Sequence, residues 1–203
     1  AAADTVSGNN PTMTGIEYLT VTSTNADVDA VINLAKATGL VAVTANYLTT
    51  NNPDQIEIDG LAAGVTVVAK ATGTLDILDI GLASATGAAD AVTVSMKTNT
   101  TSLDIDAAGI ETLNIVAGGA AGTINLAGVS PTLGSATTVN LTGTATGATG
   151  SFTLVGLNTG INTINAAALA GSLTLASGSR DADAYTITGG VNNDQLSMEN
   201  VAD

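Results

Sequence analysis

The chain has 203 residues, of which 45% are hydrophobic but only 2% aromatic, and its formal net charge is -14 at pH 7. Its 4 Lys and Arg residues cannot form the basic patches that phosphate backbones require, which excludes nucleic acid as a partner. The lack of Cys and His excludes disulfides, thiolate chemistry and Ser-His-Asp catalysis. With so few aromatic rings, the core must be built from Ala, Val, Ile and Leu, which favours a narrow, stacked interior.

The first ten residues contain a partial match to a calcium-binding repeat. Asp4-Thr5-Val6-Ser7-Gly8 fits the second half of the nonapeptide G-G-x-G-x-D-x-U-x. In that pattern the glycines make tight turns, the aspartate gives a carboxylate to calcium, and U is a buried apolar residue. We therefore expect residues 1–10 to be the remnant of such a turn, with Asp4 as a ligand. They lack the basic and apolar regions of a signal peptide, and no apolar run in the chain is long enough to predict a transmembrane segment.

Residues 11–188 contain a series of apolar-polar-apolar triplets separated by Gly, Asn, Thr and Ser. Most begin about 9 to 15 residues after the previous one. Their first residues are Leu19, Val41, Ile56, Val65, Leu75, Val92, Leu103, Leu113, Ile124, Val139, Phe152, Leu173 and Tyr185. Each triplet predicts a short strand with one buried face, and the intervals are too short for helical crossovers.

Longer internal repeats support a stacked architecture. Residues 15–21 match residues 109–115, and residues 32–43 match residues 164–175. Such self-similarity indicates units that bury their apolar faces against neighbours. We predict an all-β fold, a parallel β-solenoid over residues 11–188; an array of β-sandwiches is the alternative. Sandwiches use tight Asn-Gly or Asp-Gly hairpins, and Asp59-Gly60 is the single dipeptide of this kind, which favours the solenoid.

Residues 25–39 allow two interpretations. Val28, Ile32 and Ala35 would share one face of a helix that ends at Gly39. The matching segment at residues 164–171, however, lies among strand triplets. A short helix and a solenoid turn therefore both remain open here.

Aspartates inside the expected strands form a second cluster, Asp76 and Asp79 followed by Asp104 and Asp106. Asp104 and Asp106 are two residues apart and so share one strand face. The coil that carries Asp76 could bring it near Asp104, forming a carboxylate ladder that is repulsive without a cation. Asp76, Asp104 and Asp106 are thus candidate metal ligands, unless they are simply solvated acids. Glu57 and Asp59 have the same spacing and the same two interpretations.

Residues 189–203 begin with a nearly complete nonapeptide, Gly-Gly-Val-Asn-Asn-Asp-Gln-Leu-Ser. Calcium prefers carboxylate and carbonyl oxygens, so we predict a calcium site here. One turn cannot close such a site, and its partner is expected beyond Asp203 or in the acidic turn at residues 180–183. The candidate ligands are Asp194, Asn192, Gly189, Gly190, Asp181 and Asp183. A plain glycine-rich turn is the alternative.

These motifs give the chain a family resemblance. Its nonapeptides, its Gly-Ile-Glu-x-Leu openings at Gly15 and Gly109, and its Ala/Thr/Gly/Asn-rich triplets make it similar to RTX-type, type I-secreted bacterial surface-layer (S-layer) proteins, which are related to large RTX adhesins. The resemblance implies Ca²⁺ bound in nonapeptide turns, folding after export, and linkage of copies into a two-dimensional lattice on the bacterial cell surface. The residues it nominates for calcium are Asp194, Gly189, Gly190, Asn192 and Asp4.

We therefore expect a structural segment of a longer secreted protein rather than an enzyme. Its partners would be other copies of itself, and cell-surface polysaccharide could be bound through another part of the parent chain. The first alternative is a stalk or ligand-binding segment of an RTX adhesin. A calcium-dependent polysaccharide lyase is a further alternative that rests on fold analogy alone.

Overall fold

The computed structural model describes residues 10–23, 29–47, 55–70, 76–84, 89–96, 103–107, 110–118, 123–126, 138–144, 151–157, 161–176 and 186–197. Within these ranges the chain forms eighteen strands and no helix. The short strands β1 (Met13–Thr14) and β4 (Ala37–Thr38) pair with each other, and the other strands build two eight-stranded sheets. The predicted all-β class is confirmed.

Successive strands alternate between the two sheets. Sheet I contains β2 (Tyr18–Ser23), β5 (Ala42–Tyr47), β7 (Thr66–Lys70), β9 (Ala91–Met96), β11 (Thr112–Gly118), β13 (Thr138–Thr144), β15 (Thr163–Ala170) and β17 (Thr186–Thr188). Sheet II contains β3 (Ala30–Asn33), β6 (Gln55–Leu61), β8 (Asp76–Leu82), β10 (Leu103–Asp106), β12 (Thr123–Asn125), β14 (Ser151–Val155), β16 (Ser172–Ala176) and β18 (Gln195–Ser197).

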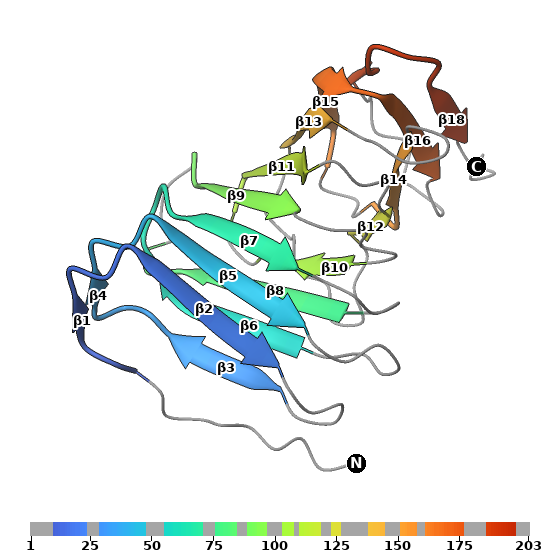
Figure 1. The fold of residues 1–203 in the computed structure, drawn as a ribbon. Helices are drawn as coiled ribbons and strands as arrows, with labels where there is room; N and C mark the ends of the chain where they lie inside the picture. Colours follow the sequence, from blue (N-terminus) through green and yellow to red (C-terminus); the bar gives the residue numbers. More distant parts are fainter. Residues whose placement is uncertain are drawn as a thin grey trace, which may run out of the picture.

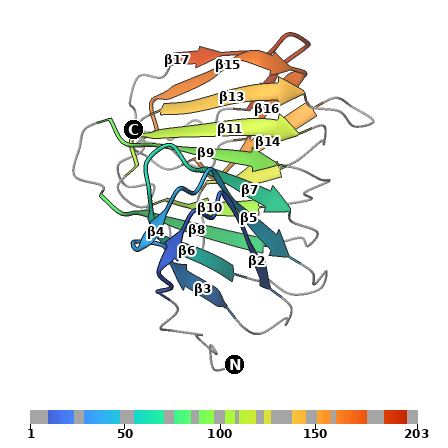
Figure 2. The ribbon, with the colours of Figure 1, turned by 60° about the vertical axis from the view of Figure 1, so that its left-hand side comes forward.

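Every pairing among the described strands is parallel, and each strand pairs with the strand one coil away in the same sheet. The chain thus winds from one sheet to the other and back, and the two layers of strands are visible in Figures 1 and 2. This is a parallel β-solenoid, as predicted. An array of antiparallel sandwiches would have required antiparallel hairpins, so that alternative is wrong for the described residues.

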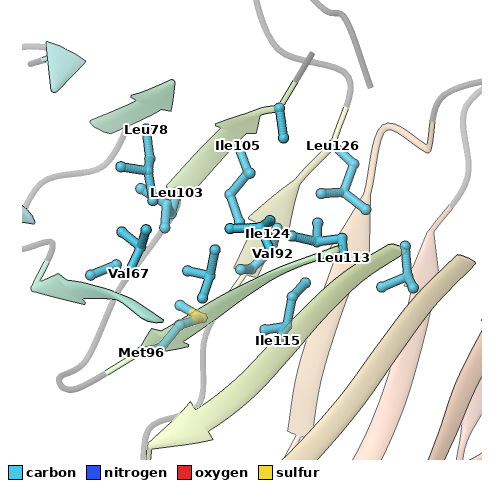
Figure 3. Packing of buried hydrophobic residues seen from close by; sticks show 14 of the residues in the cluster. Val67, Leu78, Val92, Met96, Leu103, Ile105, Leu113, Ile115, Ile124 and Leu126 are labelled. Carbon is cyan, nitrogen blue, oxygen red and sulfur yellow. The ribbon is translucent and has the colours of Figure 1, made fainter. Parts of the chain in front are cut away.

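The core lies between the two sheets and follows the predicted alternation. Figure 3 shows inward side chains from both sheets packed together, among them Val67 and Leu113 of sheet I and Leu78 and Leu103 of sheet II. All four are fully buried. Small and branched side chains suffice because the interior is narrow, as the composition predicted.

Two large aromatic side chains are nevertheless buried in this core. Phe152 is 1% exposed and Tyr47 is completely buried. The Tyr47 hydroxyl donates a hydrogen bond to the carbonyl oxygen of Ile77 at 2.7 Å. Tyr47 therefore adds apolar volume without leaving a buried hydroxyl unsatisfied.

Residues 29–38 form strands and a turn, so the helical interpretation is wrong for the described part of that segment. Strand β3 pairs with β6, and its Ala30 and Ile32 lie opposite Ile56 and Ile58. Parallel pairing over a shared apolar face outweighs the weak helical pattern. The following turn is closed by Asn33 itself, whose Oδ1 accepts a hydrogen bond from the Ala35 N–H at 3.0 Å.

The same local contact recurs at the matching position in the internal repeat. There, Asn165 Oδ1 accepts a hydrogen bond from the Ala167 N–H at 3.2 Å. Asn33 lies in sheet II, however, and Asn165 in sheet I. Asn33 closes the turn after β3, whereas Asn165 makes its contact inside β15, where the register with β13 is irregular. The repeat therefore reports a shared local asparagine contact and not the same place in the coil.

One triplet was predicted in the wrong phase. In β8 the buried residues are Leu78 and Ile80, and Asp79 points outward between them, whereas the sequence suggested Leu75-Asp76-Ile77. Both triplets alternate equally well. Pairing with the neighbouring coil determines which of the two triplets faces the core, because Leu78 and Ile80 align with Ile56 and Ile58 of β6.

Candidate functional site

The C-terminal nonapeptide forms a turn over residues 189–194 followed by strand β18. That strand extends sheet II, since Leu196 aligns with Leu175 of β16. Turn and strand therefore fall where the nonapeptide pattern places them. Leu196, at the U position, is 50% exposed because β18 is the last described strand of sheet II.

This turn is stacked on the turn of the preceding coil. The Val191 N–H donates to the Leu169 carbonyl and the Asn192 N–H donates to the Gly171 carbonyl, each at 3.2 Å. A Cβ at Gly190 would collide with the carbonyl oxygen of Gly171, so only glycine allows this approach. The stacked neighbour in the described structure is thus the turn around Gly171, which contains no acidic residue. Asp181, Asp183 and Asp4 lie outside the described residues.

The carboxylate of Asp194 joins the two turns. Its Oδ1 accepts hydrogen bonds from the Leu173 N–H of the preceding coil at 2.7 Å and from the Gly190 N–H of its own turn at 3.1 Å. Its Oδ2 lies against Gly189, where a Cβ would overlap it. Because two backbone donors already hold this carboxylate, Asp194 has a structural role that does not require an ion.

We expect Asp194→Ala to lower the free energy of unfolding by about 1 kcal/mol, because two backbone donors lose their acceptor. Asp194→Asn keeps an oxygen at that place and should retain most of this stability when calcium is absent. Urea denaturation of both variants in EDTA provides the measurement. Equal destabilisation by Ala and Asn would show that charge, and not the hydrogen bonds, joins the turns.

The acidic residues of the strands are gathered in sheet II. They are Glu57 and Asp59 on β6, Asp76 and Asp79 on β8, and Asp104 and Asp106 on β10. The described strands of sheet I contain no Asp or Glu. Three consecutive coils therefore place their strand acids on one side of the solenoid.

Register determines which of these acids face one another. Asp79 aligns with Glu57 on one side and with Asp106 on the other. We call Glu57, Asp79 and Asp106 the carboxylate ladder. Asp76 lies opposite Leu103, and Asp104 lies opposite Ile77, so the predicted Asp76–Asp104 pair is not formed. Asp79 was expected among the strand aspartates, but Asp76 was assigned to the ladder in its place because the β8 triplet was predicted in the wrong phase.

The ladder perturbs the ionisation of its members. Partial burial, followed by repulsion from Asp106 and Asp59, raises the pKa of Asp79 to about 6. Burial also raises the pKa of Glu57, with further contributions from the charge of Asp59, a hydrogen bond to the Asp59 side chain, and the charges of Asp79 and Asp29. Both shifts disfavour the charged carboxylate.

Asp104 is on the same face of β10 as Asp106 but is only 3% exposed. The interpretation of Asp104 as a solvated acid is therefore wrong. Its Oδ1 is buried without a hydrogen-bond partner. Burial raises the pKa of Asp104, and a hydrogen bond with the Asn125 side chain opposes that shift. A buried carboxylate oxygen without a donor is costly, and it costs least when the group is neutral.

No group of three or more acidic side chains in the described ranges is arranged to hold a metal ion. We therefore do not assign Asp76, Asp104 or Asp106 as metal ligands, and we restrict the calcium proposal to the nonapeptide turn. Within the same ranges, no helix has the length and apolar character needed to cross a membrane. No family model matches the chain, and neither the curated proteins nor the solved structures contain a match to it.

Proposed function

We propose that this chain is a structural segment of a calcium-dependent, self-assembling bacterial surface-layer protein that is secreted and forms the outer cell coat. The observation that carries the proposal is the docking of the turn at residues 189–194 onto the preceding coil, with β18 following it directly. Calcium would bind at this turn through Asp194 Oδ2 and backbone carbonyls, with additional ligands from outside the described residues.

The architecture supports a role in contacts between copies rather than in chemistry. A stack of coils presents two extended sheet faces with fixed spacing, which suits repeated lateral contacts in a lattice. The net charge of -14 would oppose the approach of copies at low ionic strength. Divalent cations between copies would relieve that repulsion, which is why we expect assembly to depend on calcium.

Calcium removal should lower the melting temperature more than a matched change in ionic strength does. A ligand that binds only the folded state stabilises it by about 2.7 kcal/mol at a hundred times its Kd. The measurement compares melting in calcium, in EDTA, and in NaCl of equal ionic strength, for the natural chain and for Asp194→Asn. Identical curves in EDTA and NaCl would refute the calcium proposal for this segment.

Assembly itself is tested by electron microscopy of the purified chain before and after calcium addition. Two-dimensional ordered sheets that dissolve in EDTA are the expected result. Calcium-dependent melting without any ordered assembly would support the calcium site and would contradict the lattice role.

One observation favours a ligand-binding segment of an adhesin as the second candidate. The outward face of sheet I carries aligned, uncharged polar columns, including Thr112, Thr138, Thr163 and Thr186. Beside them, Asn140 Nδ2 donates to Asn114 Oδ1 at 2.9 Å. Rows of hydroxyl and amide groups suit a neutral polysaccharide. Binding of the monomeric chain to a panel of immobilised polysaccharides, without assembly, would favour this candidate.

A further inference from the structure

We propose that the acids of sheet II form a proton-binding cluster that stabilises the stacked coils in mildly acidic solution and weakens them at neutral pH. The cluster comprises the carboxylate ladder of Glu57, Asp79 and Asp106 together with Asp59 and Asp104. It is independent of the nonapeptide turn and of the proposed surface-layer function.

Register alone makes the fully charged cluster unfavourable. Aligned residues on neighbouring parallel strands are separated by about 4.8 Å, and like charges in that position repel. The ladder aligns three carboxylates in a row across β6, β8 and β10. The side chain of Asp59 is also close by, since it lies over Gly81 of β8, where its Oδ1 would be 2.7 Å from an added Cβ.

Two features indicate where a proton would be favourable. Burial and the charges of Asp59, Asp79 and Asp29 all disfavour the charged form of Glu57. Asp104, two residues from Asp106 on the same strand face, has a buried oxygen without a partner. If Asp104 were protonated, its carboxyl group would carry no buried negative charge, and the unpartnered oxygen would cost less.

The charged groups that face Asp79 come from each neighbouring strand. Glu57 on β6 and Asp106 on β10 align with Asp79, and the charges of Asp106 and Asp59 act on it. Asp29, which precedes β3, acts on Glu57. All of these groups are acidic, and the charges that act on Asp79 and Glu57 all raise their pKa values. The folded chain therefore binds protons at a higher pH than the unfolded chain does.

The direction of the pH effect follows from that difference. The pKa of Asp79 is about 6 in the folded chain, against an ordinary value of 3.8. A raised carboxyl pKa makes the folded state less stable above that pKa, and stability is gained as the pH falls through about 6 toward 3.8. This is opposite to the behaviour of an acid in a salt bridge, whose contribution is lost on acidification.

The test is thermal unfolding in EDTA at constant ionic strength, at about pH 7.5 and about pH 5. The melting temperature of the natural chain should rise by about 2–4 °C on acidification. Asp79→Asn should melt above the natural chain at the higher pH and should gain much less on acidification. Glu17→Gln is the matched control, because it removes one charge from an exposed side chain outside the cluster and should keep the full rise.

An equal rise in all three proteins would overturn the proposal, since it would reflect general charge neutralisation. A melting temperature that falls on acidification would also overturn it. If calcium at the higher pH stabilised the natural chain but not Asp79→Asn, the cluster would be a cation site and the proton proposal would be wrong. Carboxyl ¹³C NMR of the natural chain provides an independent readout, with at least one macroscopic titration expected near pH 6.

Discussion

Phe152→Ala should lower the free energy of unfolding by about 3–5 kcal/mol. Phe152 lies on β14, is 1% exposed, and is the only Phe in the chain. Strand β14 pairs with β12 on one side and with β16 on the other, and Phe152 aligns with the buried Leu173. These strands cannot close the space that the ring leaves without breaking their register. Far-UV circular dichroism in increasing urea gives the measurement.

Two variants at the same strand separate the cavity from other causes. Phe152→Leu should cost clearly less than Phe152→Ala, because Leu retains much of the buried volume. Thr153→Ala changes the neighbouring, outward-facing side chain and should cost less than about 1 kcal/mol. A loss for Phe152→Ala no larger than that for Thr153→Ala would mean that the core adapts to the missing ring.

Gly60→Ala should be the next most damaging change, with a loss of about 3–4 kcal/mol. Gly60 has a φ of +64°, a left-handed conformation that a side chain disfavours. An added Cβ would also lie 2.6 Å from the backbone nitrogen of Ala35 and 2.9 Å from Asn33 Oδ1. It would therefore disturb the turn that follows β3 as well as the bulge in β6.

Gly64→Ala is the matched control for the backbone strain. Gly64 has a φ of +83°, but nothing lies within 4 Å of an added Cβ. Its substitution should cost about 1–2 kcal/mol from the conformation alone. The difference between the two variants in chemical denaturation measures the steric conflict with the neighbouring coil. Equal losses would show that the β3 turn moves aside freely.

The sequence predicted the strands well because each needs only local alternation. Leu103, Leu113 and Ile124 are all buried inner residues of their strands, as their triplets indicated. The parallel solenoid followed from short intervals and from the lack of hairpin dipeptides. These features depend on side-chain periodicity, which a single sequence contains.

What the sequence could not determine was the alignment between coils. The phase of β8 depends on the residues opposite it in β6, and the carboxylate ladder depends on that phase. The burial of Asp104 and the donors that hold Asp194 depend on residues in other coils as well. Predicting such contacts requires the register between strands that are about 20 residues apart, and local pattern does not provide it.

The confinement of the strand acids to sheet II makes the outward face of that sheet more negative than the outward face of sheet I along the described strands. Parallel, in-register pairing adds the contributions of successive coils instead of cancelling them, and the described strands of sheet I contain Lys70 but no acid. This difference between the two faces would grow whenever the cluster loses its protons. A negatively charged surface would therefore repel the outward face of sheet II more strongly than the threonine and asparagine columns of sheet I.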